Sequence, residues 1–459
     1  MPASRRSPPL AATPALKGRA APIDPGTAET DAHAGRAATR GRGSVYAAYT
    51  LGFLTLISAF NYLDRAVLGL ALPLIKREML VSDTALGLAS GLAFALFYSL
   101  LGVPIAWVAD RWSRRNIIAI GFGLWSVMTT VTGFVGNIWQ LAGARFLMGA
   151  GEACGVAPSN AMIADLYPQG RRTLALAILG TASSLAFIFF YPLIGWVGQH
   201  RGWRAMFMVS GVPGFVLAVA FVLTVREPAR GGRGVGRVPD IASPSSVIRF
   251  LLASPTYLLI LLGSTFMGAS VYAGSTWNAT FLTRVHHLSL AETAASIGPL
   301  QGLCGGAGIL LGGFLTDALG RRDERWLLRL PAMACLLAAP AEALFLLGRG
   351  RLAWMIGFGL MSFFALAHQA PIFAAAMSTA RARMRAVAIS MLVLVSGLLG
   401  QIAGPLLVGL LDDQLHASLG NSAVRYSLLL VAACLFAASL AFFSAIGHFA
   451  RDRERAAGA

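Results

Sequence analysis

Two short stretches of this 459-residue chain place ionisable side chains inside apolar segments. Asp64 and Arg65 are adjacent in the middle of one such segment, and Arg145 and Glu152 lie seven residues apart in another. Seven residues is close to two helical turns, so Arg145 and Glu152 face the same way on a helix. One interpretation is that the two acids and two bases form ion pairs that only hold helices together.

A functional interpretation is favoured, because buried ion pairs stabilise a protein poorly compared with apolar packing. A buried carboxylate beside an arginine can take up and release a proton as its surroundings change. Asp64 and Glu152 are therefore the predicted proton-coupling residues. Arg65 and Arg145 are their predicted charge partners and the predicted site for an anionic solute, because a guanidinium pairs bidentately with carboxylate or phosphate.

The segments that carry these residues have the composition of membrane helices. The chain is 56% hydrophobic and 12% charged, whereas soluble domains carry about 25% charged residues. The apolar runs are long enough to cross a hydrocarbon core of about 30 Å. The sequence predicts an all-α polytopic membrane protein with twelve transmembrane helices, at 46–74, 85–108, 117–136, 139–163, 173–197, 204–224, 256–282, 293–316, 326–347, 352–376, 385–411 and 424–449.

A Gly-, Pro-, Ser- and Arg-rich stretch at 226–255 divides these spans into two groups of six. The predicted organisation is a disordered cytoplasmic tail (1–44), an N-terminal six-helix bundle (45–225), a cytoplasmic linker (226–255), a C-terminal six-helix bundle (256–450) and a cytoplasmic tail (451–459).

The net charge of +17 is explained by membrane topology and does not require nucleic-acid binding. Most of the 37 Lys and Arg residues fall in the segments on the side of the chain termini. The positive-inside rule then predicts a bacterial-type inner (plasma) membrane protein with both termini cytoplasmic. The four cysteines lie in apolar segments without a metal-binding spacing, so we expect no disulfide, metal or cofactor.

A charged motif is repeated at the ends of the second and eighth spans. The first copy contains Asp110, Arg111, Arg114 and Arg115, and the second contains Asp317, Arg321 and Arg322. A carboxylate and arginines at helix ends can bridge to the ends of neighbouring helices. Both copies are therefore predicted to close a cytoplasmic gate; the alternative is that their charges only set the topology.

These residues carry a family resemblance. The segments from Gly102 to Arg115 and from Gly313 to Arg322 resemble the loop signature of the major facilitator superfamily. Arg145-x-x-x-Gly-x-Gly resembles its helix 4 motif. Glu152, Pro158, the run Ala164–Pro168 and the run Asn61–Arg65 resemble the spinster branch. The resemblance implies two pseudo-symmetric six-helix bundles around a central cavity, alternating access, and proton-linked movement of amphipathic lipids such as lysophospholipids.

Polar and aromatic residues within other spans are predicted to line the cavity: Tyr62, Tyr272, Trp277, Asn278 and His368. The predicted protein is a monomeric, proton-coupled secondary transporter for an amphipathic or anionic organic solute. A small organic-acid permease or a drug efflux pump of the same superfamily are alternatives. A membrane-embedded enzyme is disfavoured, because it needs a His–Asp or metal constellation at membrane depth and only His368 is available. A channel is disfavoured because it usually needs an oligomeric pore with a repeated polar lining.

Overall fold

The computed structural model describes residues 25–109, 111–228 and 244–458, and every regular element in these ranges is a helix. The chain divides into two compact units, residues 1–49 and 50–459. The first helix, α1 (Pro25–Met79), begins earlier than expected: residues 25–44 are helical, where the sequence predicted disorder. Their alanine content explains the difference, since Ala has the highest helix propensity. Residues 1–24 of the predicted tail lie outside the described residues.

Helices α1 to α9 form the N-terminal half. After α1 come α2 (Asp83–Ser90), α3 (Leu92–Ala109), α4 (Arg114–Thr132), α5 (Ile138–Glu152), α6 (Val156–Leu166), α7 (Gln169–Gly180), α8 (Ala182–Leu185), the π-helix η1 (Ala186–Phe190) and α9 (Tyr191–Thr224).

Helices α11 to α18 form the C-terminal half, and α10 (Pro244–Leu252) lies in the predicted linker. The half contains α11 (Pro255–Val285), α12 (Leu290–Gly320), α13 (Trp326–Leu347), α14 (Arg351–Ala367), α15 (Gln369–Ser378), η2 (Ala382–Met384), α16 (Arg385–Leu419), η3 (Gly420–Ser422), α17 (Ala423–Ser427) and α18 (Leu429–Ala457).

Helix starts are encoded locally by capping residues. Ser82 accepts a hydrogen bond from the Ala85 amide at the start of α2, and Asn137 does the same for Gln140 at the start of α5. Ser289 and Glu292 form a reciprocal capping box at the start of α12. Each side chain satisfies an amide that the first helical turn leaves without a partner.

All twelve predicted spans coincide with helices. Within the described residues, eight segments are long and apolar enough to cross a membrane, and two of these, 170–224 and 382–457, each contain two predicted spans. The segment 170–224 is divided into its two predicted spans at Gly202, whose φ of 78° ends one helix and starts the next. The span at 117–136 corresponds to α4, and the span at 139–163 corresponds to α5 followed by α6. The buried charges Arg145 and Glu152 both lie on α5.

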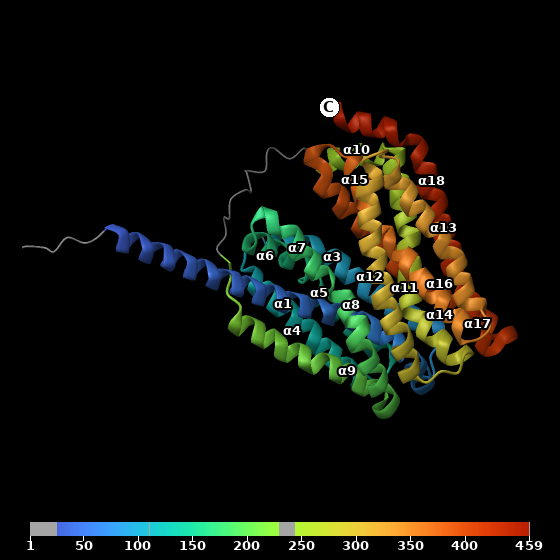
Figure 1. Cartoon of the computed structure of the whole chain (residues 1–459). Helices are drawn as coiled ribbons and strands as arrows, with labels where there is room; N and C mark the ends of the chain where they lie inside the picture. Colours follow the sequence, from blue (N-terminus) through green and yellow to red (C-terminus); the bar gives the residue numbers. More distant parts are fainter. Residues whose placement is uncertain (1–24, 110, 229–243, 459) are drawn as a thin grey trace, which may run out of the picture. The chain divides into compact units, whose positions relative to one another are not determined.

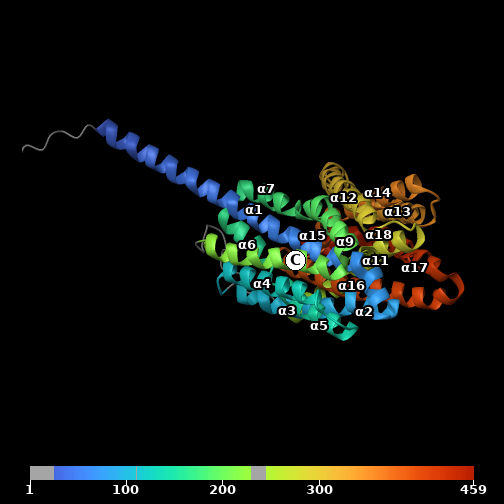
Figure 2. The ribbon, with the colours of Figure 1, turned by 90° about the horizontal axis from the view of Figure 1, so that it is seen from below.

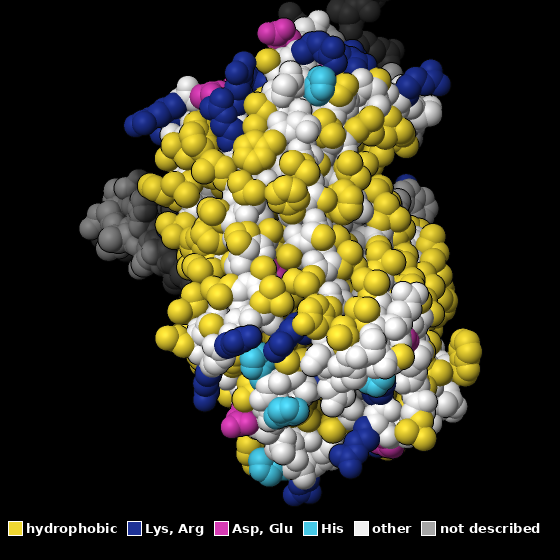
Figure 3. All heavy atoms as spheres, turned by 90° about the vertical axis from the view of Figure 1, so that its right-hand side faces the viewer, with side chains coloured by type: hydrophobic (Ala, Val, Ile, Leu, Met, Phe, Trp, Pro, Cys, Tyr) yellow, Lys and Arg dark blue, Asp and Glu magenta, His cyan; other side chains and the backbone are white. Residues whose placement is uncertain are grey.

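The surface agrees with a membrane environment. On the face shown in Figure 3, hydrophobic side chains cover the middle band, while Lys and Arg gather at its two ends. Leu310, Phe314 and Leu223 are examples of large apolar side chains that are exposed on the protein surface. Exposed apolar area of this extent is unfavourable in water and favourable against lipid.

Packing within the C-terminal half centres on α11. Figure 1 shows α11, α13, α16 and α18 side by side, and α11 contacts both α16 and α18 along much of its length. Several helix pairs join the halves: α2 packs against α16 (Figure 2), and α8, η1 and α9 pack against α12. In the contact of α8 with α12, Ser184 donates a hydrogen bond to the carbonyl of Gly302 at 3.0 Å.

Candidate functional site

A central cavity of about 530 Å³ lies between the two halves. It is lined from the N-terminal half by α1, α2, α5, α6, α8, η1 and α9, and from the C-terminal half by α11, α12, α14, α15, α16 and α18. A volume of this order accommodates a small organic molecule.

One strong ion pair joins two of the predicted charged residues. Arg65 Nε donates to Glu152 Oε2 at 2.8 Å, and the Asn61 amide donates to the same oxygen at 2.7 Å. The Arg65 guanidinium also stacks over the rings of Phe94 and Tyr98, 5.1 and 4.9 Å from their centroids. Glu152 is fully buried, whereas Arg65 lines the cavity with part of its side chain exposed.

Asp64 has no such partner. It is 1% exposed, and Thr129 Oγ1 donates to its Oδ2 at 3.2 Å. The Trp125 side chain is its other polar neighbour. Oδ1 has no partner among the described residues. Asp64 interacts electrostatically with Arg145 and Glu152 but makes no ion pair with a described cation. A buried ionised carboxylate normally has several hydrogen bonds or a cation, and Asp64 has neither.

Arg145, the second of the two arginines, forms no ion pair with a described residue. It is 2% exposed and lines the cavity, its guanidinium lies 4.9 Å from the centroid of Phe94, and Nη1 approaches Met148 Sδ at 3.0 Å. Arg145 was predicted to be one of the charge partners of the two acids, but Glu152 Oε2 accepts from Arg65 and Asn61 instead. The described structure thus contains one ion pair among the four charges, which contradicts the interpretation that all four are structurally paired.

The other predicted cavity residues divide into two groups. Tyr62, Tyr272 and Asn278 line the cavity. Trp277 does not: it is fully buried, and its Nε1 donates to the carbonyl of Pro405 at 3.0 Å, which fixes α11 to α16. His368 is also absent from the cavity lining and lies at the junction of α14 and α15.

The repeated charged motif makes its contacts within each half. Arg114 forms an ion pair with Asp165 and donates to the carbonyl of Ala161 at 3.2 Å. Glu227 accepts hydrogen bonds from the amides of Arg114 and Arg115 at 2.9 and 2.8 Å, which caps α4. Arg111 is exposed, and Asp110 lies outside the described residues.

The second copy of the motif is exposed. Asp317, Arg321 and Arg322 are exposed side chains, and no ion pair to another described residue involves them. The nearby ion pairs of the C-terminal half use Asp323 with Arg329, at 2.9 Å, and Glu324 with Arg453. In this conformation the contacts of Arg114 and Arg115 described above stay within the N-terminal half.

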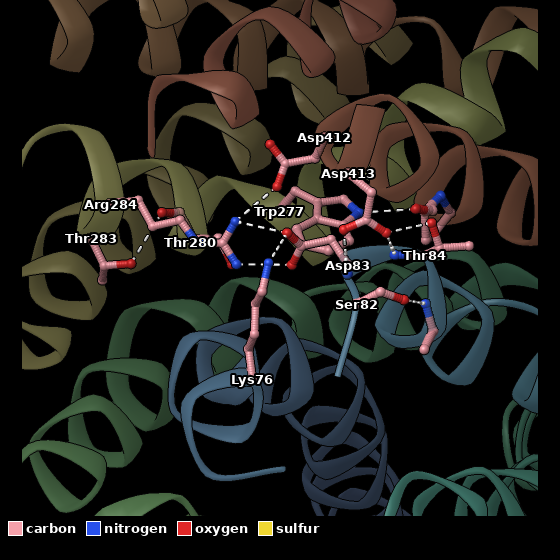
Figure 4. A network of polar contacts seen from close by, with 12 residues as sticks. Lys76, Ser82, Asp83, Thr84, Trp277, Thr280, Thr283, Arg284, Asp412 and Asp413 are labelled. Carbon is pink, nitrogen blue, oxygen red and sulfur yellow. Dashed lines mark hydrogen bonds and ion pairs between the residues drawn. The ribbon is translucent and has the colours of Figure 1, made fainter. Parts of the chain in front are cut away.

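A polar network that the sequence analysis did not identify bridges the halves at the other end of the spans (Figure 4). We call it the interhalf network; it consists of Lys76, Asp83, Thr84, Arg284, Asp412 and Asp413. Arg284 donates to Asp83 Oδ1 and to Asp412 Oδ2, both at 2.8 Å, and Lys76 pairs with Asp83. The side chains of Asp83 and Asp412 are almost completely buried.

Asp413 of α16 completes the interhalf network by capping α2. It accepts hydrogen bonds from the backbone amides of Asp83 and Thr84, at 2.9 and 2.8 Å, and from Thr84 Oγ1 at 2.6 Å. A carboxylate at a helix N-terminus satisfies free amides and interacts favourably with the helix dipole. Here the capping residue comes from the opposite half of the molecule.

Glycines let α2 and α16 touch below the interhalf network. A Cβ at Gly87 would collide with the carbonyl of Pro405, one at Gly91 with the carbonyl of Gln401, and one at Gly409 with the carbonyl of Asp83. The two backbones are therefore in direct contact over about two turns.

The halves are closed at this end, which we call the network end. The opposite end of the spans carries the charged motif, and we call it the motif end.

Comparison with known proteins identifies the family. Residues 54–405 match the model of the Major Facilitator Superfamily, so the chain belongs to this superfamily of membrane transporters and is not an enzyme. It is 31% identical over 405 residues to an MFS-type efflux pump of Mycolicibacterium smegmatis, covering 88% of this chain and 93% of that one. It is 28% identical over 296 residues to a probable galactarate/D-glucarate transporter, GudP, of Bacillus subtilis, covering 59% of this chain and 65% of that one.

The spinster-like branch is confirmed by structure. The chain matches the crystal structure of a bacterial homologue of the human lysosomal transporter Spinster, in an inward-facing and unoccupied conformation. The TM-score is 0.78 at 27% identity, and the match covers 89% of this chain and 98% of that one. The predicted fold of two pseudo-symmetric six-helix bundles is therefore confirmed.

Proposed function

We propose that this protein is a secondary active transporter that moves an anionic organic solute together with a proton by alternating access. The observation that carries the proposal is the division of the four buried charges. Arg65 and Glu152 neutralise each other, whereas neither Asp64 nor Arg145 forms an ion pair with a described residue.

Arg145 is suited to hold the anionic group of the solute. Its guanidinium lines the cavity, is almost fully buried, and its Nε has no hydrogen-bond partner among the described residues. An isolated buried cation is costly, and an anion that enters the cavity removes this cost while forming charge-assisted hydrogen bonds. Guanidinium geometry fits a carboxylate or a phosphate equally well.

Asp64 is suited to hold the coupled proton. With Asp64 protonated, the set Asp64, Arg65, Arg145 and Glu152 carries one positive charge, which a monoanionic solute neutralises. With Asp64 ionised the set is already neutral, and its carboxylate competes with the solute for Arg145. Proton and anion therefore bind together and leave together, which is the thermodynamic requirement of symport.

Alternating access follows from the two ends of the molecule. The network end is closed by α2 and α16. We propose that it faces the outside of the cell and that both termini are cytoplasmic, so that the described conformation is inward-facing. The positive-inside bias supports this orientation. The likeness to the inward-facing bacterial spinster homologue supports the conformation.

Transport in proteoliposomes tests the coupling. Liposomes loaded with a pH-sensitive dye and reconstituted with the purified protein are mixed with D-glucarate or with sphingosine 1-phosphate. The expected result for a transported anion is acidification of the lumen that depends on the protein. Asp64→Asn keeps the size but cannot release a proton, so it should abolish both acidification and uphill accumulation while exchange of solute across the membrane survives. Glu152→Gln should shift the pH dependence of transport. Full gradient-driven accumulation by Asp64→Asn would place the coupling site elsewhere.

Efflux of an amphipathic compound is the second candidate. The cavity wall of the C-terminal half is mainly apolar and includes Met267, Val271, Phe358 and Met361, which suits a hydrophobic body attached to an anionic head. Arg145→Gln separates the candidates: it should abolish binding of an anionic solute and leave binding of an uncharged apolar compound intact.

A further inference from the structure

Three polar side chains line the cavity on helices that lie at or next to the contact between α2 and α16. They are Ser90 of α2, Asn278 of α11 and Gln401 of α16. Each is more than nine-tenths buried, with exposed fractions of 7%, 6% and 5%. We call this group the floor subsite.

None of the three is satisfied by the protein. Ser90 Oγ and Asn278 Oδ1 have no hydrogen-bond partner among the described residues, and no hydrogen bond of the Gln401 side chain is found there either. Two other polar residues of the same cavity are satisfied: Ser362 donates to Gln301 Oε1 at 3.1 Å, and Thr276 donates to the carbonyl of Tyr272 at 2.8 Å. Buried polar groups without partners are uncommon in proteins, so three on the wall of one cavity need an explanation.

Backbone contacts hold the floor subsite in position. Gly91, next to Ser90, lies against the carbonyl of Gln401 so closely that a Cβ would collide with it. On the other side, Gly69 of α1 lies equally close to the carbonyls of Ser275 and Thr276. In the described conformation these backbone contacts fix the separation of the helices. Ser90, Asn278 and Gln401 line the cavity there, so a solute in the cavity is the nearest possible source of hydrogen-bond partners for them.

We infer that the floor subsite binds hydroxyl groups of the transported solute, which is therefore a hydroxylated organic acid rather than a single-chain lipid. The inference rests on the proposed function, in which Arg145 holds the anionic group. A serine hydroxyl and two carboxamides both donate and accept hydrogen bonds and carry no net charge, which matches alcohol groups. An alkyl chain at the same place would leave all three without a partner.

The position of the floor subsite also gives the solute a part in closing the transporter. Ser90 belongs to the N-terminal half, and Asn278 and Gln401 belong to the C-terminal half. A hydroxylated chain bound there joins the two halves directly beneath their contact. Its binding energy is then available only in a conformation in which α2 and α16 are together.

Matched pairs of acids test the inference on the full-length protein. D-Gluconate and hexanoate share chain length and charge but differ in hydroxyl groups, as do D-glucarate and adipate. Each is titrated against the purified protein while its thermal unfolding is followed. We expect the hydroxylated member of at least one pair to bind 10-fold or more tightly than its deoxy partner, because a site built for hydroxyl groups rejects an analogue that lacks them.

Near-isosteric variants assign the preference to the floor subsite. Ser90→Ala, Asn278→Leu and Gln401→Met should each reduce the preference for the hydroxylated acid 5-fold or more and leave binding of the deoxy acid within 2-fold. Ser183→Ala is the matched control, because Ser183 lines the same cavity on α8 but bonds to the carbonyl of Gly180. It should leave the preference unchanged.

The outcomes separate this inference from the proposed function. Equal binding of both members of each pair by the wild type overturns the floor subsite; if Arg145→Gln then abolishes binding of both, the anion site stands. Tighter binding of lysophosphatidate than of any hydroxylated acid, lost in Arg145→Gln, also overturns the inference and supports a lipid-like solute. Binding of either kind that survives Arg145→Gln contradicts the proposed function itself.

Discussion

The two ends of this transporter use their charged residues differently. At the network end, Asp83 of one half is bound by Arg284 of the other, and Asp413 caps a helix of the opposite half. At the motif end, the described contacts of Arg114 and Arg115 stay within one half. One set of charges joins the halves in this conformation, and the other leaves them independent.

The difference shows which interactions must break for the transporter to change conformation. Opening the network end exposes Asp83 and Asp412 and separates α2 from α16, so it requires a compensating gain elsewhere. The exposed residues Asp317, Arg321 and Arg322 at the motif end are available to provide that gain. The comparison predicts that perturbations at the network end shift the conformational equilibrium and that equal perturbations at the motif end do not.

Topology gives the largest expected effect, because it is all or none. With the four native cysteines replaced, a cysteine at His200, near the network end, should react fully with an impermeant thiol reagent in intact cells. A cysteine at Arg455, in the last turn of α18, should react only after the membrane is permeabilised. Labelling of position 455 but not of position 200 would reverse the assignment of the two ends.

Separating α2 from α16 by a side chain should produce the largest conformational shift. Gly91→Val places a branched side chain against the carbonyl of Gln401, and no closed arrangement accommodates it. Spin labels at Arg77 and Ser418, both exposed at the network end, should report a longer distance for most molecules. Gly102→Val is the control, because a Cβ there meets nothing within 4 Å. An unchanged distance in the Gly91→Val protein would show that this contact does not define the closed state.

Much of the fold could be predicted from the sequence, because membrane spans are continuous apolar runs bounded by polar residues. The twelve spans and the two groups of six were predicted from these apolar runs. The residues that resemble the spinster branch were recognised within the first span, 46–74, and the fourth, 139–163. The helical segment at 25–44 was not, since composition alone does not separate an Ala-rich disordered tail from a helix. The roles of individual charges were harder to predict for a different reason.

Pairing between helices depends on tertiary contacts that spacing along one helix does not determine. The spacing of Arg145 and Glu152 correctly put both inside the protein, but Asn61 and Arg65 of another helix decide which of them is paired. Trp277 was predicted to line the cavity, but its neighbours Thr276 and Asn278 do so, because each residue turns a helix by about 100°. Trp277 contacts α16 instead.

The interhalf network joins residues more than 300 positions apart, such as Thr84 and Asp413. Its local signals were charged residues just beyond the ends of apolar spans, among them Arg284 and the adjacent acids Asp412 and Asp413.

Removing the central cation of the interhalf network should have the next largest effect. Arg284→Gln leaves Asp83 and Asp412 buried without their shared partner, and breaking a buried ion pair from one side costs about 3–5 kcal/mol. The same pair of spin labels should report a mixture of closed and open network ends. Arg329→Gln is the control, because its pair with Asp323 lies within the C-terminal half at the motif end. A closed distribution identical to the wild type would mean that the glycine contacts alone hold this end.

Asp413→Asn should have a smaller effect in the same direction. Asparagine keeps one acceptor oxygen, so the bonds from the amide and hydroxyl of Thr84 to Oδ2 can persist, whereas the Asp83 amide loses its acceptor Oδ1. The variant also loses the interaction of the charge with the helix N-terminus, which is about 0.3–1 kcal/mol. Asp413→Ala, which also removes the bonds from Thr84, should shift the distance distribution further. Equal effects of the two variants would show that the bonds from Thr84 do not matter.

The smallest effect on the conformational equilibrium is expected for Arg114→Gln. Its pair with Asp165 lies within the N-terminal half, so both conformations can retain it, and its loss should lower thermal stability without lengthening the distance at the network end. A double-mutant cycle with Asp165→Asn should give a coupling energy of about 1 kcal/mol or less, because both side chains are partly exposed.

The informative measurement combines Arg114→Gln with Gly91→Val, which holds the network end open. The charged motif is proposed to close the motif end when the network end is open. If it does, Arg114→Gln removes an interaction that stabilises this open-network conformation and should partly restore the short distance between the labels at the network end. If the distance in the double variant equals that in Gly91→Val alone, Arg114 does not take part in closing the motif end, and its charge serves the membrane topology.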